Sequence, residues 1–179
     1  MAWTETAPGV FYGDGPTIRF SAQEIAFLVS HARANTNRRA RICAHPTLDD
    51  PVHEMLICLL DDGYIRPHRH AKYESLHVIE GACDLVLFDQ MGQIEDVMRL
   101  GTQPDDLLFA RLAPGTFHTL CIRTRHFVFH ETARGPFDRA DTEYASWAPP
   151  ENDTDSSAAY LAELEAAITR FSRPERGER

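Results

Sequence analysis

Apolar and polar residues alternate over short runs through the middle of the chain. From about residue 53 to residue 132 these runs are separated by turns rich in Asp, Gly and Pro, and they cover 54–60, 63–67, 75–80, 83–89, 94–99, 107–112, 117–123 and 126–132. Side chains two apart on a strand share a face, so such runs are typical of strands with one buried side. Many short strands at a spacing of about ten residues indicate an all-β sandwich or barrel.

Two flanking segments have helical periodicity instead. The first opens with Ser21 and Glu24 at the spacing of a capping box, and apolar residues follow at helical intervals, which predicts a helix over about 21–34. The second predicts a helix over about 156–171, with one apolar face made of Tyr160, Leu164, Ala167, Ile168 and Phe171.

The remaining segments are rich in Pro and Gly. Residues 1–20 are expected to be irregular, and residues 133–155 are expected to wrap the barrel. The predicted organisation is therefore an N-terminal extension (1–52), a barrel core (53–132), and a wrapping segment with a C-terminal helix (133–179).

The bulk composition narrows the class of protein. A chain of 179 residues, 43% apolar and 25% charged, is typical of one globular domain. Its net charge of -9 argues against nucleic acid or an anionic membrane as a partner. The first residues have no signal-peptide pattern, and no apolar run reaches the length of about 20 residues that a membrane span needs, so a cytoplasmic location is expected. Four widely spaced cysteines are expected to be buried small hydrophobic residues.

The chemistry with the most specific spacing lies between Gly63 and Gly81. His68 and His70 share a strand face, and Glu74 can join them if the chain stays extended or bends. Two imidazoles and a carboxylate that converge form a ligand set for a divalent transition metal. Histidine pairs on a strand can also be ordinary barrel residues bonded to their neighbours, and the sequence leaves that interpretation open.

A fourth candidate ligand follows about forty residues later. In Gly115-Thr-Phe-His118 a turn leads into a strand whose apolar face carries His118, Leu120 and Ile122. That face should point inward, which puts His118 at the rim of the barrel, where barrels keep ligand sites.

These two segments resemble the two motifs of cupins. The first is Gly63-x4-His68-x-His70-x3-Glu74-x6-Gly81, one residue shorter than usual before its first histidine, and the second is Gly115-x2-His118, with its proline moved next to the glycine and Ile122 in place of the usual asparagine. The flanking residues of 35–150 are similar to the WbuC family of cupin fold metalloproteins, through the segments Arg66–His70, Leu85–Asp89, Gly115–Thr119, Gly135–Asp138 and Trp147–Pro149.

The resemblance implies a double-sheet jelly roll with one metal bound by His68, His70, Glu74 and His118. Three nitrogens and one oxygen suit Zn, Fe(II), Mn or Ni. It also implies an association with bacterial surface-polysaccharide (O-antigen) gene clusters. Of His130 and Glu131, one must face inward, and the resemblance favours Glu131 as a general base or a group that supports the ligands.

Basic residues near these motifs indicate an anionic small-molecule ligand. Arg66 has the same strand parity as His68 and is expected to reach the cavity, with Tyr73 nearby. Arg39 and Arg41 either belong to a solvated linker or line a mouth for an anion such as a sugar phosphate, nucleotide sugar or keto acid.

The sequence is compatible with three functions. The chain could be a metal-dependent isomerase, epimerase or oxygenase, a non-catalytic metal-dependent binding module, or a cupin whose metal is structural, because the fold hosts many activities. Unpaired sheet edges need cover, so a homodimer is expected.

Overall fold

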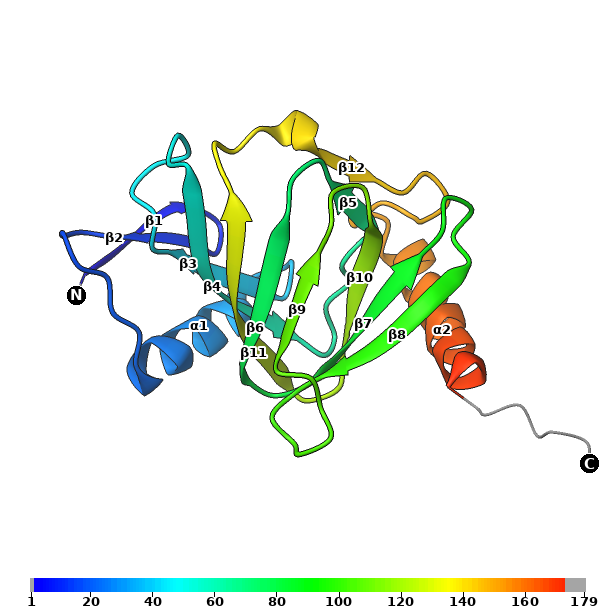
Figure 1. The fold of residues 1–179 in the computed structure, drawn as a ribbon. Helices are drawn as coiled ribbons and strands as arrows, with labels where there is room; N and C mark the ends of the chain where they lie inside the picture. Colours follow the sequence, from blue (N-terminus) through cyan, green and yellow to red (C-terminus); the bar gives the residue numbers. More distant parts are fainter. Residues whose placement is uncertain (1, 173–179) are drawn as a thin grey trace, which may run out of the picture.

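The computed structural model describes residues 2–172, which fold into two β-sheets with a helix on either side (Figure 1). The helices are α1 (Ala22–Ala34) and α2 (Thr154–Phe171), and a 3-10 turn spans Arg139–Asp141. The strands are β1 (Trp3–Ala7), β2 (Val10–Gly13), β3 (Arg39–Cys43), β4 (Val52–Leu60), β5 (His68–His70), β6 (Glu74–Glu80), β7 (Cys83–Phe88), β8 (Ile94–Leu100), β9 (Phe109–Leu112), β10 (Phe117–Ile122), β11 (His126–Arg134) and β12 (Thr142–Tyr144).

The two sheets face each other across the main core. One has the strand order β1-β2-β3-β4-β11-β6-β9 and the other β12-β5-β10-β7-β8. Their inner faces meet in a cluster that includes Leu76, Leu85, Leu120, Phe127 and Phe129. The all-β prediction with two flanking helices is therefore confirmed, and the apolar face of β10 points inward as the alternation of residues predicts.

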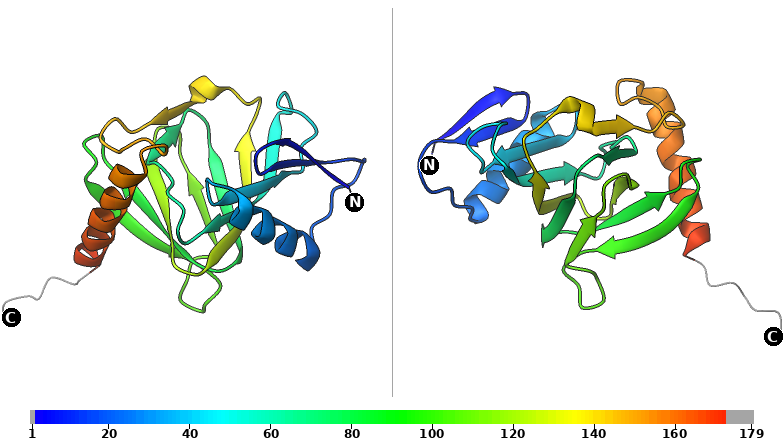
Figure 2. Two further views of the ribbon diagram at one scale, coloured as in Figure 1. Left: turned by 180° about the vertical axis from the view of Figure 1, so that it is seen from behind. Right: turned by 45° about the horizontal axis from the view of Figure 1, so that its top comes forward.

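Each helix covers the outer face of one sheet, as the view from behind shows (Figure 2). Helix α1 packs through Leu28 and Ala32 on the first sheet, and its Ser21 and Glu24 form the predicted capping box. Helix α2 packs through Leu164 and Ile168 on the second sheet. No helix in the described part of the chain is long and apolar enough to span a membrane.

The structure differs from the sequence prediction at the N-terminal end. Residues predicted to be irregular form the β1–β2 hairpin, because Gly9 makes the turn with φ of 72°. The segment around Arg39 and Arg41, for which a solvated linker was one expectation, forms β3, which pairs in parallel with β2 and antiparallel with β4. Strands on both sides of residue 52 thus belong to one sheet, while the predicted three-part division of the chain stays a prediction.

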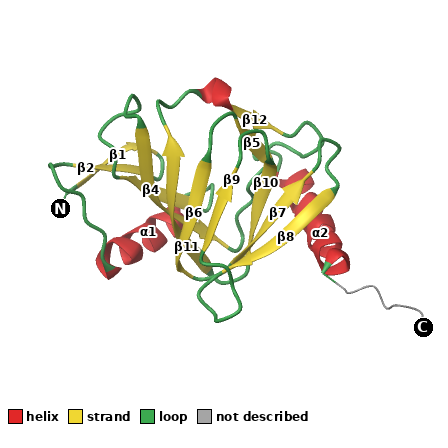
Figure 3. Cartoon of the chain, in the orientation of Figure 1, coloured by secondary structure: helices red, strands yellow, loops and turns green. Residues whose placement is uncertain are grey.

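Two further differences concern the segments next to the candidate ligands. Residues 63–67 form no strand; Pro67 has no N–H for a ladder, and the carbonyl of Ile65 accepts from the Thr119 hydroxyl at 2.6 Å. The wrapping segment contributes β12, which pairs antiparallel with β5 and so lies beside the strand that carries His68 and His70 (Figure 3).

Candidate metal centre

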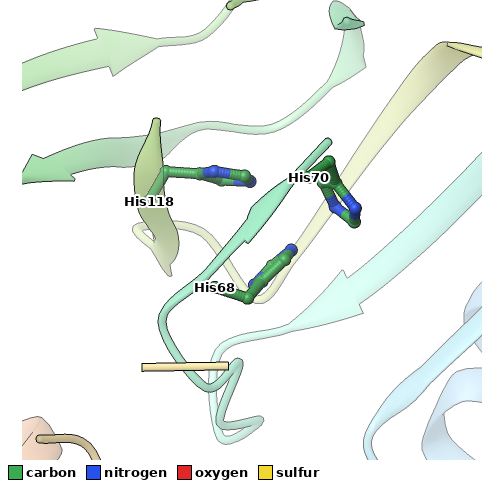
Figure 4. Close-up of side chains that lie close together, drawn as sticks. All are labelled: His68, His70 and His118. Atoms are coloured by element: carbon green, nitrogen blue, oxygen red, sulfur yellow. The ribbon is translucent and has the colours of Figure 1, made fainter. Parts of the chain in front are cut away.

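Three histidines from two neighbouring strands converge inside the barrel. His68 and His70 share a face of β5, and His118 of β10 lies directly opposite His68 in the ladder. The ring centroids of His68 and His118 are 4.5 Å apart, and those of His68 and His70 are 4.8 Å apart. One ring nitrogen from each histidine lies within 4.8 Å of the other two (Figure 4). The three imidazoles therefore form a candidate metal site.

Every one of these rings has its Nδ1 atom held by an oxygen. His68 Nδ1 lies 2.9 Å from the Arg66 carbonyl oxygen, and His118 Nδ1 lies 3.0 Å from the Thr116 carbonyl oxygen. His70 Nδ1 lies 3.1 Å from the Thr142 hydroxyl oxygen. A carbonyl oxygen can only accept, so Nδ1 of His68 and His118 carries the proton. When these two imidazoles are neutral, their Nε2 atoms are left as lone-pair donors, the arrangement that metal-bound histidines have.

Glu74, at the start of β6, brings a carboxylate to the same place. Its Oε1 lies 3.0 Å from His118 Nε2, and its Oε2 lies 3.4 Å from His70 Nε2. The carboxylate is buried, and Nε2 of His118 accepts when its ring is neutral, so this contact joins two acceptors. A buried set made of acceptors needs a cation, either a proton or a metal ion.

The electrostatics of the cluster reflect this need for a cation. Burial and the nearby rings of His118 and His70 lower the pKa of His68 to about 3, and burial is also the main cause of the lowered pKa of His70. For His118, burial opposes the charged form, but the hydrogen bond to Glu74 outweighs it and raises the pKa. The same contact keeps the pKa of Glu74 below its ordinary value despite burial. The contact between Glu74 and His118 is thus stabilised by a positive charge, which a bound metal ion would also supply.

Glu131 also faces the centre. It lies on β11 two residues after inward-facing Phe129 and therefore on the same face of the strand. His130 lies on the opposite face, and its Nε2 is 3.8 Å from the Glu54 carboxylate. Burial and the nearby Glu74 raise the pKa of Glu131 to about 8. The Glu131 side chain is therefore largely a neutral carboxylic acid at pH 7, able to donate a proton within the cavity.

Two connected hollows surround the candidate centre. The barrel cavity has a volume of about 400 Å³ and is lined by His68, His118 and apolar residues of both sheets. The side chamber, about 140 Å³, lies towards the ends of β3 and β4 and is lined by Tyr12, Cys43, His45, His53 and Tyr73, among others. Six residues line both hollows, which therefore adjoin each other: Arg41, His70, Glu74, Glu131, Phe137 and Thr142.

The predicted ligand-binding side chains have different surroundings. Arg39 borders the barrel cavity but forms a two-pronged ion pair with Glu151, with N–O distances of 3.0 and 2.8 Å. Arg66 donates to the Ala145 carbonyl at 2.7 Å, and among the described residues it is not one of those lining either hollow. The parity that was expected to bring Arg66 to the cavity does not apply, because residues 63–67 are not a strand.

Several residues at the site could not be found by local sequence reasoning. Thr142 contacts His70 from a position 72 residues away in the chain. His45 and His53, for which the sequence suggests no partner, stack on each other in the wall of the side chamber with ring centroids 4.0 Å apart. The spacing of the chain carries no signal for these contacts because each depends on how distant strands pair.

Comparison with known proteins identifies the fold. A family model described as a domain of unknown function, DUF6016, matches residues 20–100, which include β5 and β6 but end before His118. No curated protein matches the sequence. An uncharacterized conserved protein with a double-stranded β-helix domain from Klebsiella pneumoniae is similar over 73% of this chain and 99% of its own, at 18% identity and a TM-score of 0.52. The double-stranded β-helix is the jelly roll of cupins. This chain has the cupin fold.

Two further solved structures are similar at low sequence identity. A protein from Shewanella oneidensis is similar over 73% of this chain and 80% of its own, at 15% identity and a TM-score of 0.51. A cupin 2 conserved barrel domain protein from Rhodopseudomonas palustris is similar over 73% of this chain and 77% of its own, at 16% identity and a TM-score of 0.48. Identities this low carry no information about activity, which has to be argued from the chemistry of the site.

Proposed function

We propose that this protein is a metal-binding cupin that acts on an anionic, sugar-derived small molecule at a centre formed by His68, His70, Glu74 and His118. The observation that carries the proposal is the cluster of three imidazoles and one buried carboxylate in a hollow large enough for a ligand. Three nitrogens and one oxygen suit Zn, Fe(II), Mn or Ni. A bound metal ion would polarise a carbonyl or lower the pKa of a bound water.

The side chains around the centre have separate tasks in this proposal. The carbonyls of Arg66 and Thr116 and the hydroxyl of Thr142 orient the three rings. Glu131 exchanges a proton with a ligand oxygen, a role that its raised pKa supports. Apolar residues of the barrel cavity, among them Leu76, Leu120 and Phe129, keep bulk water away from the ligand.

The polysaccharide assignment rests on the resemblance to the WbuC family. That resemblance extends through both candidate motifs and their flanking residues, and it is the reason for proposing a sugar-derived ligand rather than another anion. We place the protein in surface-polysaccharide metabolism, in a cytoplasmic setting, as an isomerase, epimerase or oxygenase.

Metal content tests the proposed centre. We expect purified protein to hold about one divalent metal ion per chain by elemental analysis, and Glu74→Gln and His118→Ala to lose most of it, because each removes a ligand. His77→Ala is the matched control, because His77 is exposed on the same strand as Glu74. Equal metal content in His118→Ala and His77→Ala would contradict the proposed ligand set.

Turnover tests the activity separately. Metal-loaded protein should convert a sugar phosphate or a nucleotide sugar, with or without oxygen, and Glu131→Gln should lower the rate while the metal content stays unchanged. Ligand-induced thermal stabilisation without any product would instead favour a binding module. A loaded protein that neither binds nor converts these compounds would point to a structural metal.

We also propose that the protein forms a homodimer. Strand β9 is an edge of the first sheet, and apolar side chains are exposed at its first residue, Phe109, and at Leu108 just before it. Exposed edges of this kind pair readily with another chain. Light scattering should give twice the chain mass of 20.2 kDa, and a mass of one chain at all concentrations would refute the dimer.

A further inference from the structure

We infer that the side chamber is the subsite for the anionic group of the ligand, and that Arg41 is the residue that binds this carboxylate or phosphate. The inference rests on the proposed function, because it places the rest of the ligand beside the candidate metal centre. It also selects one arginine among the three that the sequence offers as candidates.

The backbone of Arg41 is held on both sides. Its N–H donates to the Gly9 carbonyl at 2.8 Å, and the residue pairs with Val10 of β2 and Ile57 of β4. The guanidinium therefore extends from the middle of a fixed sheet rather than from a loop, and a fixed base limits the entropy lost when a ligand binds.

Alternation along β3 directs Arg41 towards the hollows. Ala40 and Ile42 pack against α1 on the outer face of the sheet. Arg41 and Cys43 lie on the opposite face, where both line the side chamber. Arg41 also borders the barrel cavity, together with His70 and Glu74. Its side chain thus stands where the chamber meets the candidate metal centre.

Three other cations near the centre are already engaged. Arg39 is paired with Glu151, and Arg66 donates to the Ala145 carbonyl. Lys72 contacts both the Asp141 carboxylate and the Pro136 carbonyl oxygen at 2.6 Å. Within residues 2–172 the Arg41 guanidinium makes no hydrogen bond or ion pair, so all its donors are free for a ligand.

None of the acidic side chains that face the chamber forms an ion pair with Arg41 in the described part of the chain. Asp141 is paired with Lys72, and Asp138 accepts from the Ala140 N–H at the start of the 3-10 turn. Glu74 is in contact with His118 and His70, and Glu131 lies within electrostatic range of Arg41 without an ion pair to it. Arg134, at the end of β11, lines the chamber as a second positive charge.

The chemistry of the guanidinium and the sizes of the two hollows define the ligand class. The planar fork of arginine matches the two oxygens of a carboxylate or phosphate. The chamber of about 140 Å³ suits the anionic group, and the barrel cavity of about 400 Å³ suits the remainder of the molecule. The ligand is therefore a small molecule with one anionic end at Arg41 and an oxygen function that reaches the histidines.

Side-chain NMR of the full chain tests the inference. The Nε–H signal of Arg41, assigned by its loss in Arg41→Gln, is followed during titration with inorganic phosphate, with glucuronate and with neutral glucose. We expect a saturable shift with phosphate or glucuronate and none with glucose; the anion that acts identifies the source of the charge. Because the guanidinium supplies charge-assisted hydrogen bonds to the anion, affinity should fall at least about tenfold in Arg41→Gln.

Two controls keep the test decisive. Arg125→Gln removes the same charge from an exposed turn beyond the end of β10 and should bind like the wild type. Arg41→Lys keeps the charge without the fork and should bind with intermediate affinity. An unshifted Arg41 signal with both anions, or equal affinity in Arg41→Gln, overturns the inference. If Arg41→Gln does not fold, loss of the same signal in Arg41→Lys assigns it, and the wild-type titration still decides.

The metal centre is checked on the same samples. Elemental analysis reports whether metal is present, and the titration is repeated on protein stripped with a chelator. If the protein holds no metal but the Arg41 signal still shifts with the anion, the proposed metal centre is wrong and the anion subsite stands. If the protein holds metal but the Arg41 signal does not shift, the anion subsite is wrong and the metal centre stands.

Discussion

Three oxygen atoms fix the rings of the candidate metal ligands. Two of them are carbonyls two residues before the histidine they hold, at Arg66 for His68 and at Thr116 for His118. The third is the hydroxyl of Thr142, which β12 brings to His70. The first two oxygens are close to their histidines in the sequence, and the third depends on the pairing of β12 with β5.

Thr142→Val tests the value of that third support. Valine has nearly the same shape but no hydroxyl, so the His70 ring loses its partner while the strand pairing of β12 remains. We expect metal affinity to fall about tenfold or more, as it does when groups that orient metal-bound histidines are removed. Competition with a chelator of known affinity measures the change, and Thr132→Val on β11 serves as a control that should leave affinity unchanged.

Helix α1 packs on the outer face of the first sheet, and its N-terminus is capped by side chains of the chain segment at which it begins. The Ser21 hydroxyl and carboxylate of Glu24 form a reciprocal pair with the first backbone N–H groups of the helix. Leu28 of this helix is fully buried against β3 and β4, the strands that position Arg41. Fraying of the helix start would therefore weaken the sheet beneath the side chamber.

Ser21→Ala should lower the free energy of unfolding by about 1 kcal/mol, because it removes the cap. Ser30→Ala is the control within the same helix. Ser30 is exposed in the helix interior, where alanine is at least as favourable as serine, so this variant should be as stable as the wild type or slightly more stable. Urea unfolding of both variants measures the difference, and equal losses would argue against the cap.

Two turn glycines in the barrel differ in what surrounds them. Both adopt positive φ, 85° at Gly81 and 82° at Gly115. A Cβ at Gly81 would overlap the carbonyl oxygen of His126 and lie 2.6 Å from the Thr124 hydroxyl, whereas a Cβ at Gly115 would meet nothing within 4 Å. Backbone strain is therefore common to both positions, and steric overlap is specific to the first.

Gly115→Ala should cost about 1 kcal/mol, since only the left-handed conformation is penalised. Gly81→Ala should cost clearly more, because the β6–β7 turn must also move away from the His126 backbone. Thermal and urea unfolding of the two variants provide the comparison. A smaller loss in Gly81→Ala than in Gly115→Ala would contradict the packing of this turn.

Four buried thiols, two in each sheet, make the stability of the whole molecule depend on pH under alkaline conditions. Burial raises the pKa of Cys58 and Cys121 to about 12, and it also raises the pKa of Cys43 and Cys83. In the unfolded chain thiols ionise near their ordinary pKa of 9.0, so above that pH the unfolded state holds fewer protons than the native state. The free energy of unfolding must then fall as the pH rises.

We expect this loss to begin near pH 9 and to continue towards pH 12, at about 1.4 kcal/mol per pH unit for each thiol that stays protonated in the native state. Urea unfolding at several alkaline pH values measures the slope. Cys58→Ala should unfold more easily at every pH because of its cavity, but its slope should be shallower by the contribution of one thiol. An unchanged slope would refute the role of Cys58.

By itself the sequence determined the features that depend on neighbours along the chain. The capping box places the start of α1, and the alternation of residues in β10 puts His118 on the same face as Leu120 and Ile122. The residue types at 68, 70, 74 and 118 identify a candidate metal site, because the spacing of two on a strand requires His68 and His70 to share a face.

Only the tertiary structure decided the features that depend on which strands meet. The N-terminal hairpin gains its place from pairing with β3, a long-range contact that local propensity does not encode. The sequence offers Arg39, Arg41 and Arg66 as candidates for binding an anion, but Arg39 pairs with Glu151 and Arg66 donates to the Ala145 carbonyl. Which charge stays free, and which hydroxyl holds His70, follows from contacts between segments more than 70 residues apart.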